Sequence, residues 1–396
     1  MPDNPVIHKA DQHIAATYQR FPVVFTKGRG ATLWDSEGRA YTDFVAGIAV
    51  CALGHAHPRI AQAVSEQMNR LVHVSNLYYT EPQTELAAWL TANSFADRVF
   101  FGNSGAEANE AAIKLARKYF KSKGETRRYE IIAMEQSFHG RTMATLSATG
   151  QAKIKKGFEP VLQGFHFAPF NDADALERMI TDTTCAVLIE PVQGEGGVCC
   201  PDPKYLKAVR HLCDKTGTLL IFDEIQTGIG RTGKLFGYQH FGIEPDIMTL
   251  AKALANGLPM GAMLAREHIA EAFGYGAHAS TFGGGPVIAA AALAVLKLIE
   301  EEKIVNRCAE TSKYFVGHLE ELKAKYDVVQ QVRGLGLLLG LKLKVEGAPI
   351  VTACMENGFL INCVQNNILR FIPPLIIEKK EIDDLIRCLD KILADI

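Results

Sequence analysis

The stretch Leu219-Leu220-Ile221-Phe222-Asp223-Glu224 decides the fold, because four apolar residues in a row are followed at once by two acids. A second stretch of the same kind, Ile247-Met248-Thr249-Leu250-Ala251-Lys252, ends on a lysine. Both patterns predict short buried strands that are bounded by glycine and polar residues. Because strand ends carry the chemistry of an α/β sheet, we expect Asp223 and Lys252 to emerge near each other.

A lysine and an aspartate at neighbouring strand ends are what one cofactor requires of its protein. A desolvated lysine can form a Schiff base with an aldehyde. A buried aspartate can hold a pyridinium nitrogen in its protonated form, and pyridoxal phosphate (PLP) needs both groups. Taken alone, Asp223 and Lys252 are more often an ordinary salt link at a solvated sheet edge.

Composition narrows the class of protein. The chain has 396 residues, of which 48% are hydrophobic and 22% charged, as in soluble globular proteins. Its formal net charge is −2 with no basic stripe, which argues against nucleic acid or a membrane surface as a partner. The nine cysteines have irregular spacings and no C-x-x-C pair, so we expect free thiols in a reducing cytoplasm and no metal site. The polar N-terminus has no signal-peptide pattern, and the apolar run 287–296 is too short to span a bilayer.

Predicted strands alternate with helices from about residue 85 to about 280, which indicates a mostly parallel sheet covered by helices. Apolar residues at helical spacing predict a helix over 106–120, and alternation around a Ser-Glu-Gly turn predicts a hairpin within 30–44. Strands near 329–343 and a helix near 380–394 indicate a second, smaller α/β unit, which the N-terminal segment is expected to complete. The candidate strands of the main sheet are 99–101, 131–134, 186–189, 219–222, 247–250 and 261–264.

Three further segments carry residues suited to a cofactor and a substrate. Ser104 and Gly105 precede the predicted amphipathic helix, where backbone N–H groups can bind phosphate, although a plain helix cap also explains them. Phe138 and Arg141 could stack on a cofactor and bind a carboxylate, although a structural role is the commoner explanation for such a pair. A glycine-rich loop after another predicted strand holds two acids, Glu190 and Glu195.

Together these segments resemble the class III (ω-) aminotransferases of the fold-type I PLP superfamily, over nearly the whole chain and in the same order. The most specific piece is the run from Phe222 to Gly233, followed by Lys252. Within the class, the chain looks like the acetylornithine aminotransferase branch, on the stretches 46–55, 75–79, 103–110 and 138–142.

The resemblance implies an α/β fold in which a large PLP-binding domain has a mostly parallel seven-stranded sheet and a smaller α/β domain stands beside it. The expected bounds are 1–50 for an N-terminal arm and part of the small domain, 51–285 for the large domain and 286–396 for the C-terminal small domain.

The resemblance also implies roles at the cofactor. Lys252 would form the Schiff base and then shuttle a proton, while Asp223 would pair with the pyridine nitrogen. Gln226 would lie near the ring hydroxyl, and Phe138 would stack on the ring. The phosphate would be held by Ser104, Gly105 and Ala106 and, from the other subunit of a homodimer, by Thr281.

For the substrates, the resemblance implies two arginines and an acid. Arg141 would bind the carboxylate of the amino-acid donor, and Arg370 the α-carboxylate of glutamate. Glu195 would pair with Arg370 when the acylated donor is bound, because a buried unpaired charge costs on the order of 3–5 kcal/mol. Ser280 would also contact substrate. The chain has Gly285 where the family usually has asparagine, so the resemblance to the family does not extend to this position of the loop.

The activity that the resemblance implies is transfer of the terminal amino group of N2-acetylornithine to 2-oxoglutarate. The products would be N-acetylglutamate 5-semialdehyde and glutamate, in arginine biosynthesis. The alternatives are transamination of succinyldiaminopimelate, succinylornithine, ornithine or 4-aminobutyrate, and a different PLP reaction on the same scaffold. We expect a cytoplasmic homodimer with shared active sites, while the acyl group, the direction of flux and any larger assembly stay open.

Overall fold

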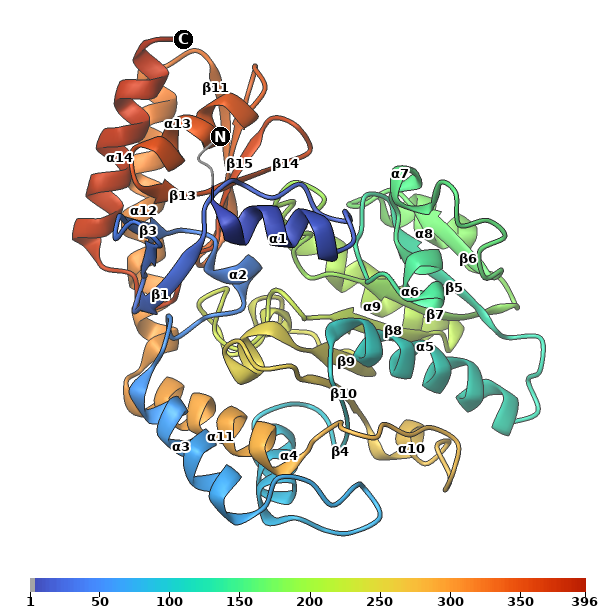
Figure 1. Ribbon diagram of the computed structural model, residues 1–396. Coiled ribbons are helices and arrows are strands. Elements are labelled where there is room, and N and C mark those ends of the chain that lie inside the picture. Colours follow the sequence, from blue (N-terminus) through green and yellow to red (C-terminus); the bar gives the residue numbers. More distant parts are fainter. Residues whose placement is uncertain (1–3) are drawn as a thin grey trace.

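The computed structural model describes residues 4–396, and its largest element is a seven-stranded sheet in the order β4-β10-β9-β8-β7-β5-β6 (Figure 1). Neighbouring strands from β9 to β6 run parallel, whereas β10 runs antiparallel to β4 and β9. The mostly parallel seven-stranded sheet is thus confirmed. Its strands are β4 (Arg98–Gly102), β5 (Glu130–Met134), β6 (Phe165–Ala168), β7 (Thr184–Ile189), β8 (Leu219–Asp223), β9 (Ile247–Leu250) and β10 (Gly261–Ala265).

Alternate side chains of the central strands pack on opposite faces of this sheet. Leu219 and Ile221 of β8 share a hydrophobic cluster with α5 (Gly105–Ser122), whereas Leu220 and Phe222 share another with α9 (Pro203–Thr216). Because both faces are covered, β8 is apolar along its length until Asp223, and its sequence therefore predicts a buried strand.

The sequence does not predict the edge strand β6. This strand has four residues, pairs only with β5 among the described strands, and includes the exposed His166. An edge strand that is half exposed lacks the continuous apolar run that identifies a strand buried on both faces.

Two four-stranded sheets stand beside the main one. The first joins β1 (Phe25–Arg29), β2 (Thr32–Asp35), β3 (Ala40–Asp43) and β13 (Phe359–Leu360). The turn between β2 and β3 is the predicted one, and β13 pairs in parallel with β3, so the N-terminal segment joins the C-terminal part of the chain. The second contains β11 (Val329–Leu335), β12 (Leu338–Leu343), β15 (Ile368–Phe371) and β14 (Asn362–Val364).

Among the remaining helices, α11 packs against α3 and α4, and α12 packs against β11 and α14. Their bounds are α1 (Pro5–His13), α2 (Ala46–Ala49), α3 (Pro58–Arg70), α4 (Glu81–Ala92), α6 (Met143–Ala148), α7 (Ala152–Lys155), α8 (Ala173–Met179), α10 (Glu267–Ala270), α11 (Pro286–Glu301), α12 (Ile304–Lys325), α13 (Ala348–Glu356) and α14 (Lys379–Ala394), with 3-10 turns η1 (Gly237–His240) and η2 (Lys252–Ala255). No helix within residues 4–396 combines the length and the apolar character that crossing a bilayer requires.

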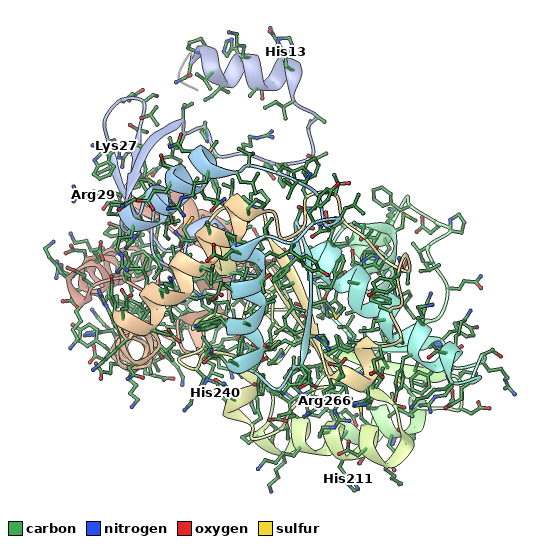
Figure 2. The ribbon with its side chains drawn as sticks, turned by 90° about the horizontal axis from the view of Figure 1, so that it is seen from below. His13, Lys27, Arg29, His211, His240 and Arg266 are labelled. Carbon is green, nitrogen blue, oxygen red and sulfur yellow. The ribbon has the colours of Figure 1, made fainter. Side chains whose placement is uncertain are left out.

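Six basic side chains illustrate how the basic residues belong to different elements of the chain. Figure 2 labels these six, which belong to α1, β1, α9, η1 and the start of α10: His13, Lys27, Arg29, His211, His240 and Arg266.

Candidate active site

A cavity of about 450 Å³ opens where β8 and β9 end, at the place that the strand-end argument predicts. Its walls come from the start of α5 and from the loops that follow β5, β7, β8 and β9. Most of the predicted site residues line it, namely Ser104, Gly105, Ala106, Phe138, Arg141, Glu195, Asp223, Gln226 and Lys252. Segments that are far apart in the chain therefore meet at one carboxyl edge of the sheet.

Lys252 begins the turn η2 just after β9, and its backbone φ of 47° lies in the left-handed region that non-glycine residues rarely adopt. Burial lowers the pKa of its amine to about 8, although the charge of Glu195 opposes the shift. Near neutral pH, Lys252 therefore has a larger neutral, nucleophilic fraction than an exposed lysine.

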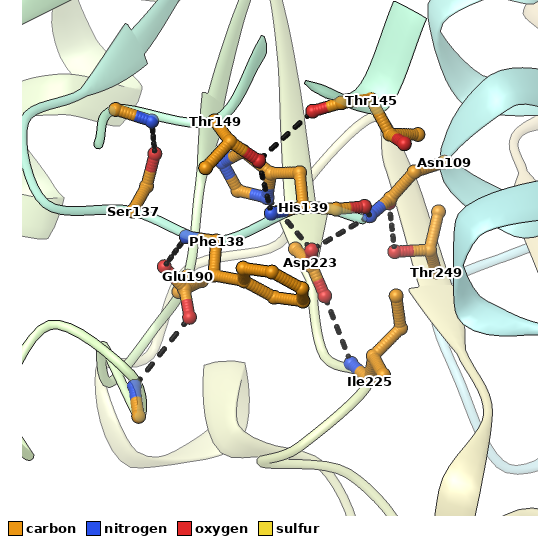
Figure 3. Close-up of polar contacts among 12 residues, drawn as sticks. Asn109, Ser137, Phe138, His139, Thr145, Thr149, Glu190, Asp223, Ile225 and Thr249 are labelled. Carbon is orange, nitrogen blue, oxygen red and sulfur yellow. Dashed lines mark hydrogen bonds and ion pairs between the residues drawn. The ribbon is translucent and has the colours of Figure 1, made fainter. Parts of the chain in front are cut away.

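The carboxylate of Asp223 accepts hydrogen bonds from donors on three different segments (Figure 3). Its Oδ2 accepts hydrogen bonds from Asn109 Nδ2 at 2.8 Å and from His139 Nδ1 at 2.7 Å. Its Oδ1 accepts one from the Ile225 N–H at 3.1 Å. Because Asp223 is only 4% exposed, these donors replace the water that an exposed carboxylate would bind.

The start of α5 is capped and presents free backbone donors to the cavity. Ser104 Oγ accepts from the Glu107 N–H at 3.2 Å, which confirms the predicted cap. Glu107 Oε2 in turn accepts from the backbone and side-chain nitrogens of Asn103 at 2.7 and 2.9 Å. The N–H groups of Gly105 and Ala106 lie in the first helical turn, which has no intrahelical acceptor for them, so an anion can bind there.

Glu190 joins the loop of Phe138 to the loop of Glu195. Its Oε2 accepts from the Phe138 N–H at 3.2 Å and its Oε1 from the Gly194 N–H at 3.4 Å (Figure 3). Burial raises the pKa of the Glu190 carboxyl well above its ordinary value, and the nearby charge of Asp223 adds to the shift. The buried Glu190 carboxyl thus links two loops that form walls of the cavity, the loop of Phe138 and the loop of Glu195.

Arg141 and Arg370 differ sharply in environment. Arg141 is exposed, and its guanidinium carbon lies 5.7 Å from the centre of the Phe138 ring, with no ion pair to any residue in the described range. Arg370, in β15, is 1% exposed, and its Nη1 lies 2.6 Å from Glu195 Oε1. One arginine is therefore available at the cavity, whereas the other is covered by an acid.

Further contacts fix the Arg370–Glu195 pair. Arg370 Nε donates to Asn362 Oδ1 at 3.2 Å, and Nη1 is 3.5 Å from Gln226 Oε1. Burial acts to raise the pKa of the Glu195 carboxyl, but the charge and hydrogen bond of Arg370, together with Lys252 and Gln226, hold that pKa below its ordinary value. Glu195 is consequently ionised at neutral pH and can neutralise Arg370.

Three predicted residues do not line the cavity of this chain, namely Arg370, which pairs with the lining residue Glu195, and the loop residues Ser280 and Thr281. The hydroxyl of Ser280 accepts from Asn103 Nδ2 at 3.2 Å and from the Gly283 N–H at 3.0 Å, so it stabilises its own loop. Thr281 is exposed. The substrate contact of Ser280 and the phosphate contact of Thr281 stay predictions.

The sequence reasoning does not single out Asn109, His139 or Asn362. A signal for Asn109 was available, because it stands on the buried face of α5 between apolar neighbours, where an amide requires hydrogen-bond partners. His139 and Asn362 have no comparable local signal, since their partners are distant in the chain.

Comparison with known proteins points to one family. The family model for aminotransferase class-III matches residues 13–393. The acetylornithine aminotransferase of Caldanaerobacter subterraneus subsp. tengcongensis is 51% identical over 97% of this chain and 98% of its own length. That of Methanocaldococcus jannaschii is 51% identical over 96% of this chain and 95% of its own.

Solved structures agree with the family match. The ornithine aminotransferase of Toxoplasma gondii superposes with a TM-score of 0.95 at 34% identity, covering 98% of this chain and 94% of that one. The acetylornithine aminotransferase of Elizabethkingia anophelis superposes with a TM-score of 0.88 at 34% identity, covering 99% and 98%.

Proposed function

The chain belongs to the class III aminotransferases, and we propose that it transfers the terminal amino group of N2-acetylornithine to 2-oxoglutarate with PLP as cofactor. The products would be N-acetylglutamate 5-semialdehyde and glutamate, in arginine biosynthesis. Relatives named for this activity are 51% identical over almost the whole chain. The single observation that carries the proposal is the pairing of the buried Arg370 with Glu195, in a cavity that Arg141 also lines without an ion pair to any residue of 4–396.

The donor set of the cavity fits PLP at each of its reactive groups. The free N–H groups of Gly105 and Ala106 suit a phosphate. Asp223 is a buried acceptor for a protonated ring nitrogen, and Lys252 is a buried amine for an aldehyde. When bound, PLP would supply an aldehyde that takes up an amino group and a protonated ring that withdraws electrons.

Individual residues would then divide the work. Lys252 would hold the cofactor covalently, and its Nζ would later take a proton from the amine-bearing carbon of the donor. Asp223 would keep the ring nitrogen protonated. Phe138 would flank the ring, and Gln226, which lies beside the Arg370–Glu195 pair, would approach the ring hydroxyl.

Two arginines account for two substrates of different charge. N2-acetylornithine has one carboxylate and a neutral amide, so it would use Arg141 and leave Arg370 paired with Glu195. Glutamate has two carboxylates, and its α-carboxylate would replace Glu195 on Arg370. Glu195 thus avoids the free-energy cost of leaving the buried Arg370 guanidinium unpaired during the N2-acetylornithine half-reaction, which does not use Arg370.

We also propose that the active unit is a homodimer in the cytoplasm, divided into large and small domains near residues 50 and 285. Thr281 is exposed and would reach the cofactor phosphate of the other subunit. Apolar side chains near it in sequence or in the adjacent loop are also exposed, at 65% for Phe282, 85% for Leu77 and 100% for Tyr79. Such a group of side chains is expected at an interface.

A substrate panel with purified protein tests the proposal. Addition of PLP should produce a visible absorbance band that shifts on adding glutamate. With 2-oxoglutarate as acceptor, kcat/KM should be highest for N2-acetylornithine among N2-acetylornithine, N2-succinylornithine, N-succinyl-diaminopimelate, ornithine and 4-aminobutyrate. A higher kcat/KM for a succinylated donor would mean that the acyl group of the substrate is succinyl and not acetyl. A higher kcat/KM for ornithine or 4-aminobutyrate would overturn the proposal.

A further inference from the structure

Asn109 forms hydrogen bonds with both Asp223 and Thr249, and Thr249 belongs to β9, the strand that leads to Lys252. Asn109 lies in α5, one turn after the backbone amides of the phosphate site, and is completely buried. Its Nδ2 donates to Asp223 Oδ2 and to the carbonyl oxygen of His139, both at 2.8 Å. Its Oδ1 accepts from Thr249 Oγ1 at 2.8 Å (Figure 3).

Partner chemistry fixes the orientation of this amide. The His139 carbonyl and the Asp223 carboxylate can only accept, so the nitrogen of Asn109 must face them. Its oxygen therefore faces Thr249, whose hydroxyl must donate. A flipped amide would oppose acceptor to acceptor at both His139 and Asp223, so these two acceptors set the direction of the amide. The Thr249 hydroxyl, which can donate or accept, adds a third hydrogen bond that holds the amide in place.

The same bonds decide which oxygen of Asp223 is free for a ligand. Oδ2 already accepts from Asn109 and His139, whereas Oδ1 accepts from Ile225 alone among residues 4–396. A carboxylate oxygen can accept more than one hydrogen bond, so Oδ1 keeps the capacity for another. Asp223 lines the cavity, and Oδ1 is therefore the oxygen left for a donor that enters it.

A neutral donor suits this position better than a cation would. An amide stabilises the charged carboxylate by a hydrogen bond without neutralising it. The negative charge of Asp223 then remains available to a positively charged ring nitrogen in the cavity. A lysine or arginine at position 109 would instead form an ion pair with Asp223 and so neutralise the charge that the ring nitrogen needs.

We propose that Asn109, held in place by its hydrogen bond from Thr249, is a positioning residue that holds Asp223 Oδ1 toward the cofactor and thereby keeps the cofactor ring nitrogen protonated. This inference rests on the proposed PLP function. Thr249 stands three residues before Lys252, so the same amide also ties the aspartate to the strand that delivers the lysine.

The test measures the protonation of the ring nitrogen directly. Apoprotein is loaded with PLP that carries ¹⁵N in its ring, and the ¹⁵N chemical shift is read at neutral pH. The native protein should give the shift of a protonated ring. Asn109→Leu, which keeps the approximate volume and removes the amide, should move the shift toward the unprotonated value. Loss of one hydrogen bond to a charged group should also lower kcat by about ten- to a hundredfold, with a smaller change in KM for the donor.

A matched pair at Thr249 keeps the test decisive if Asn109→Leu fails to fold. Thr249→Val keeps the shape of the side chain but removes the hydroxyl, and it should move the ¹⁵N shift in the same direction. Thr249→Ser keeps the hydroxyl and should retain the native shift. A native ¹⁵N shift in Asn109→Leu would overturn the proposal, and so would a native shift in Thr249→Val where Asn109→Leu does not fold. The same displaced shift in Thr249→Ser and Thr249→Val would also overturn it, whatever happens to the melting temperature.

Failure of the parent proposal gives a different result. A native protein that neither binds PLP nor transaminates would refute the proposed function itself. A native protein that does both, with variants that keep a protonated ring, would refute only the role of Asn109.

Discussion

Glu195→Gln should shift the preference of the enzyme toward glutamate without a general loss of activity. Glu195 Oε1 lies 2.6 Å from Nη1 of the buried Arg370. Glutamate would have to displace Glu195 before its α-carboxylate could reach Arg370, whereas N2-acetylornithine would leave the pair intact. Glutamine keeps the shape and removes the charge, so glutamate no longer has to break an ion pair.

The size of the shift follows from the burial of the pair. Breaking a fully buried ion pair costs about 3–5 kcal/mol. Glu195 keeps 30% exposure, and Arg370 retains Asn362 and Gln226 as acceptors, so a smaller value of about 2 kcal/mol is expected. A factor of ten corresponds to about 1.36 kcal/mol, so the ratio of kcat/KM for the two half-reactions should move about 30-fold in favour of glutamate.

Stopped-flow absorbance of the bound cofactor measures each half-reaction separately. In Glu195→Gln, the glutamate half-reaction should be unchanged or faster, while the N2-acetylornithine half-reaction should slow or bind its donor more weakly, because Arg370 stays uncompensated. Arg370→Ala should do the reverse and mainly raise KM for glutamate. Glu346→Gln is the matched control, because Glu346 is exposed and lines a neighbouring recess with Glu195. Equal losses in both half-reactions for Glu195→Gln would mean that Glu195 has a structural role only.

Four further predictions test the rest of the site. Lys252→Ala should abolish turnover, and borohydride reduction of the native protein should place the pyridoxyl label on Lys252; peptide mapping that finds another lysine labelled would refute the assignment. Because burial lowers the Lys252 pKa to about 8, and only the neutral amine is nucleophilic, the rate of PLP capture by apoprotein should rise with pH up to about 8 and then level off; a rate that keeps rising to the ordinary lysine value of about 10.4 would contradict this. Asp223→Ala should lower the single-turnover rate by at least about tenfold, since a charge-assisted hydrogen bond contributes roughly 1.5–3 kcal/mol, and a near-normal rate would exclude its role at the ring. Tyr79→Asp should place a charge on a fully exposed apolar group and lower dimer content and activity together in sedimentation and rate measurements, whereas fully active monomers would rule out shared active sites.

Most of the main sheet could be predicted because its central strands are covered on both faces. β8 and β9 are buried at every position, so each appears in the sequence as an apolar run that stops where the chain reaches the sheet edge. The helix α5 was equally clear, since its buried residues recur at helical spacing. The edge strand β6, half exposed, has no such run and was missed.

The roles of the site residues came from a different source than the strands. The positions of Asp223 and Lys252 follow from strand ends, but the pairing of Glu195 with Arg370 was expected only from resemblance to a family. The structure places these two side chains 2.6 Å apart, although Glu195 lies in the loop after β7 of the main sheet and Arg370 lies in β15 of another sheet. No local pattern could have shown that contact, because it depends on how the two sheets are packed.

By itself, the sequence determined where the chain is buried and where polar groups interrupt that burial. Burial produces a local pattern of apolar residues, because the backbone of a strand or helix sets the directions in which neighbouring side chains point. Only the tertiary structure decided which polar groups meet at those interruptions. Asp223 receives its donors from Asn109 and His139, which are 114 and 84 residues away in the chain. A hydrogen bond forms only when the donor and acceptor atoms are placed to within a few tenths of an ångström. The packing of strands, helices and loops from distant parts of the chain determines that placement, and no single stretch of sequence does.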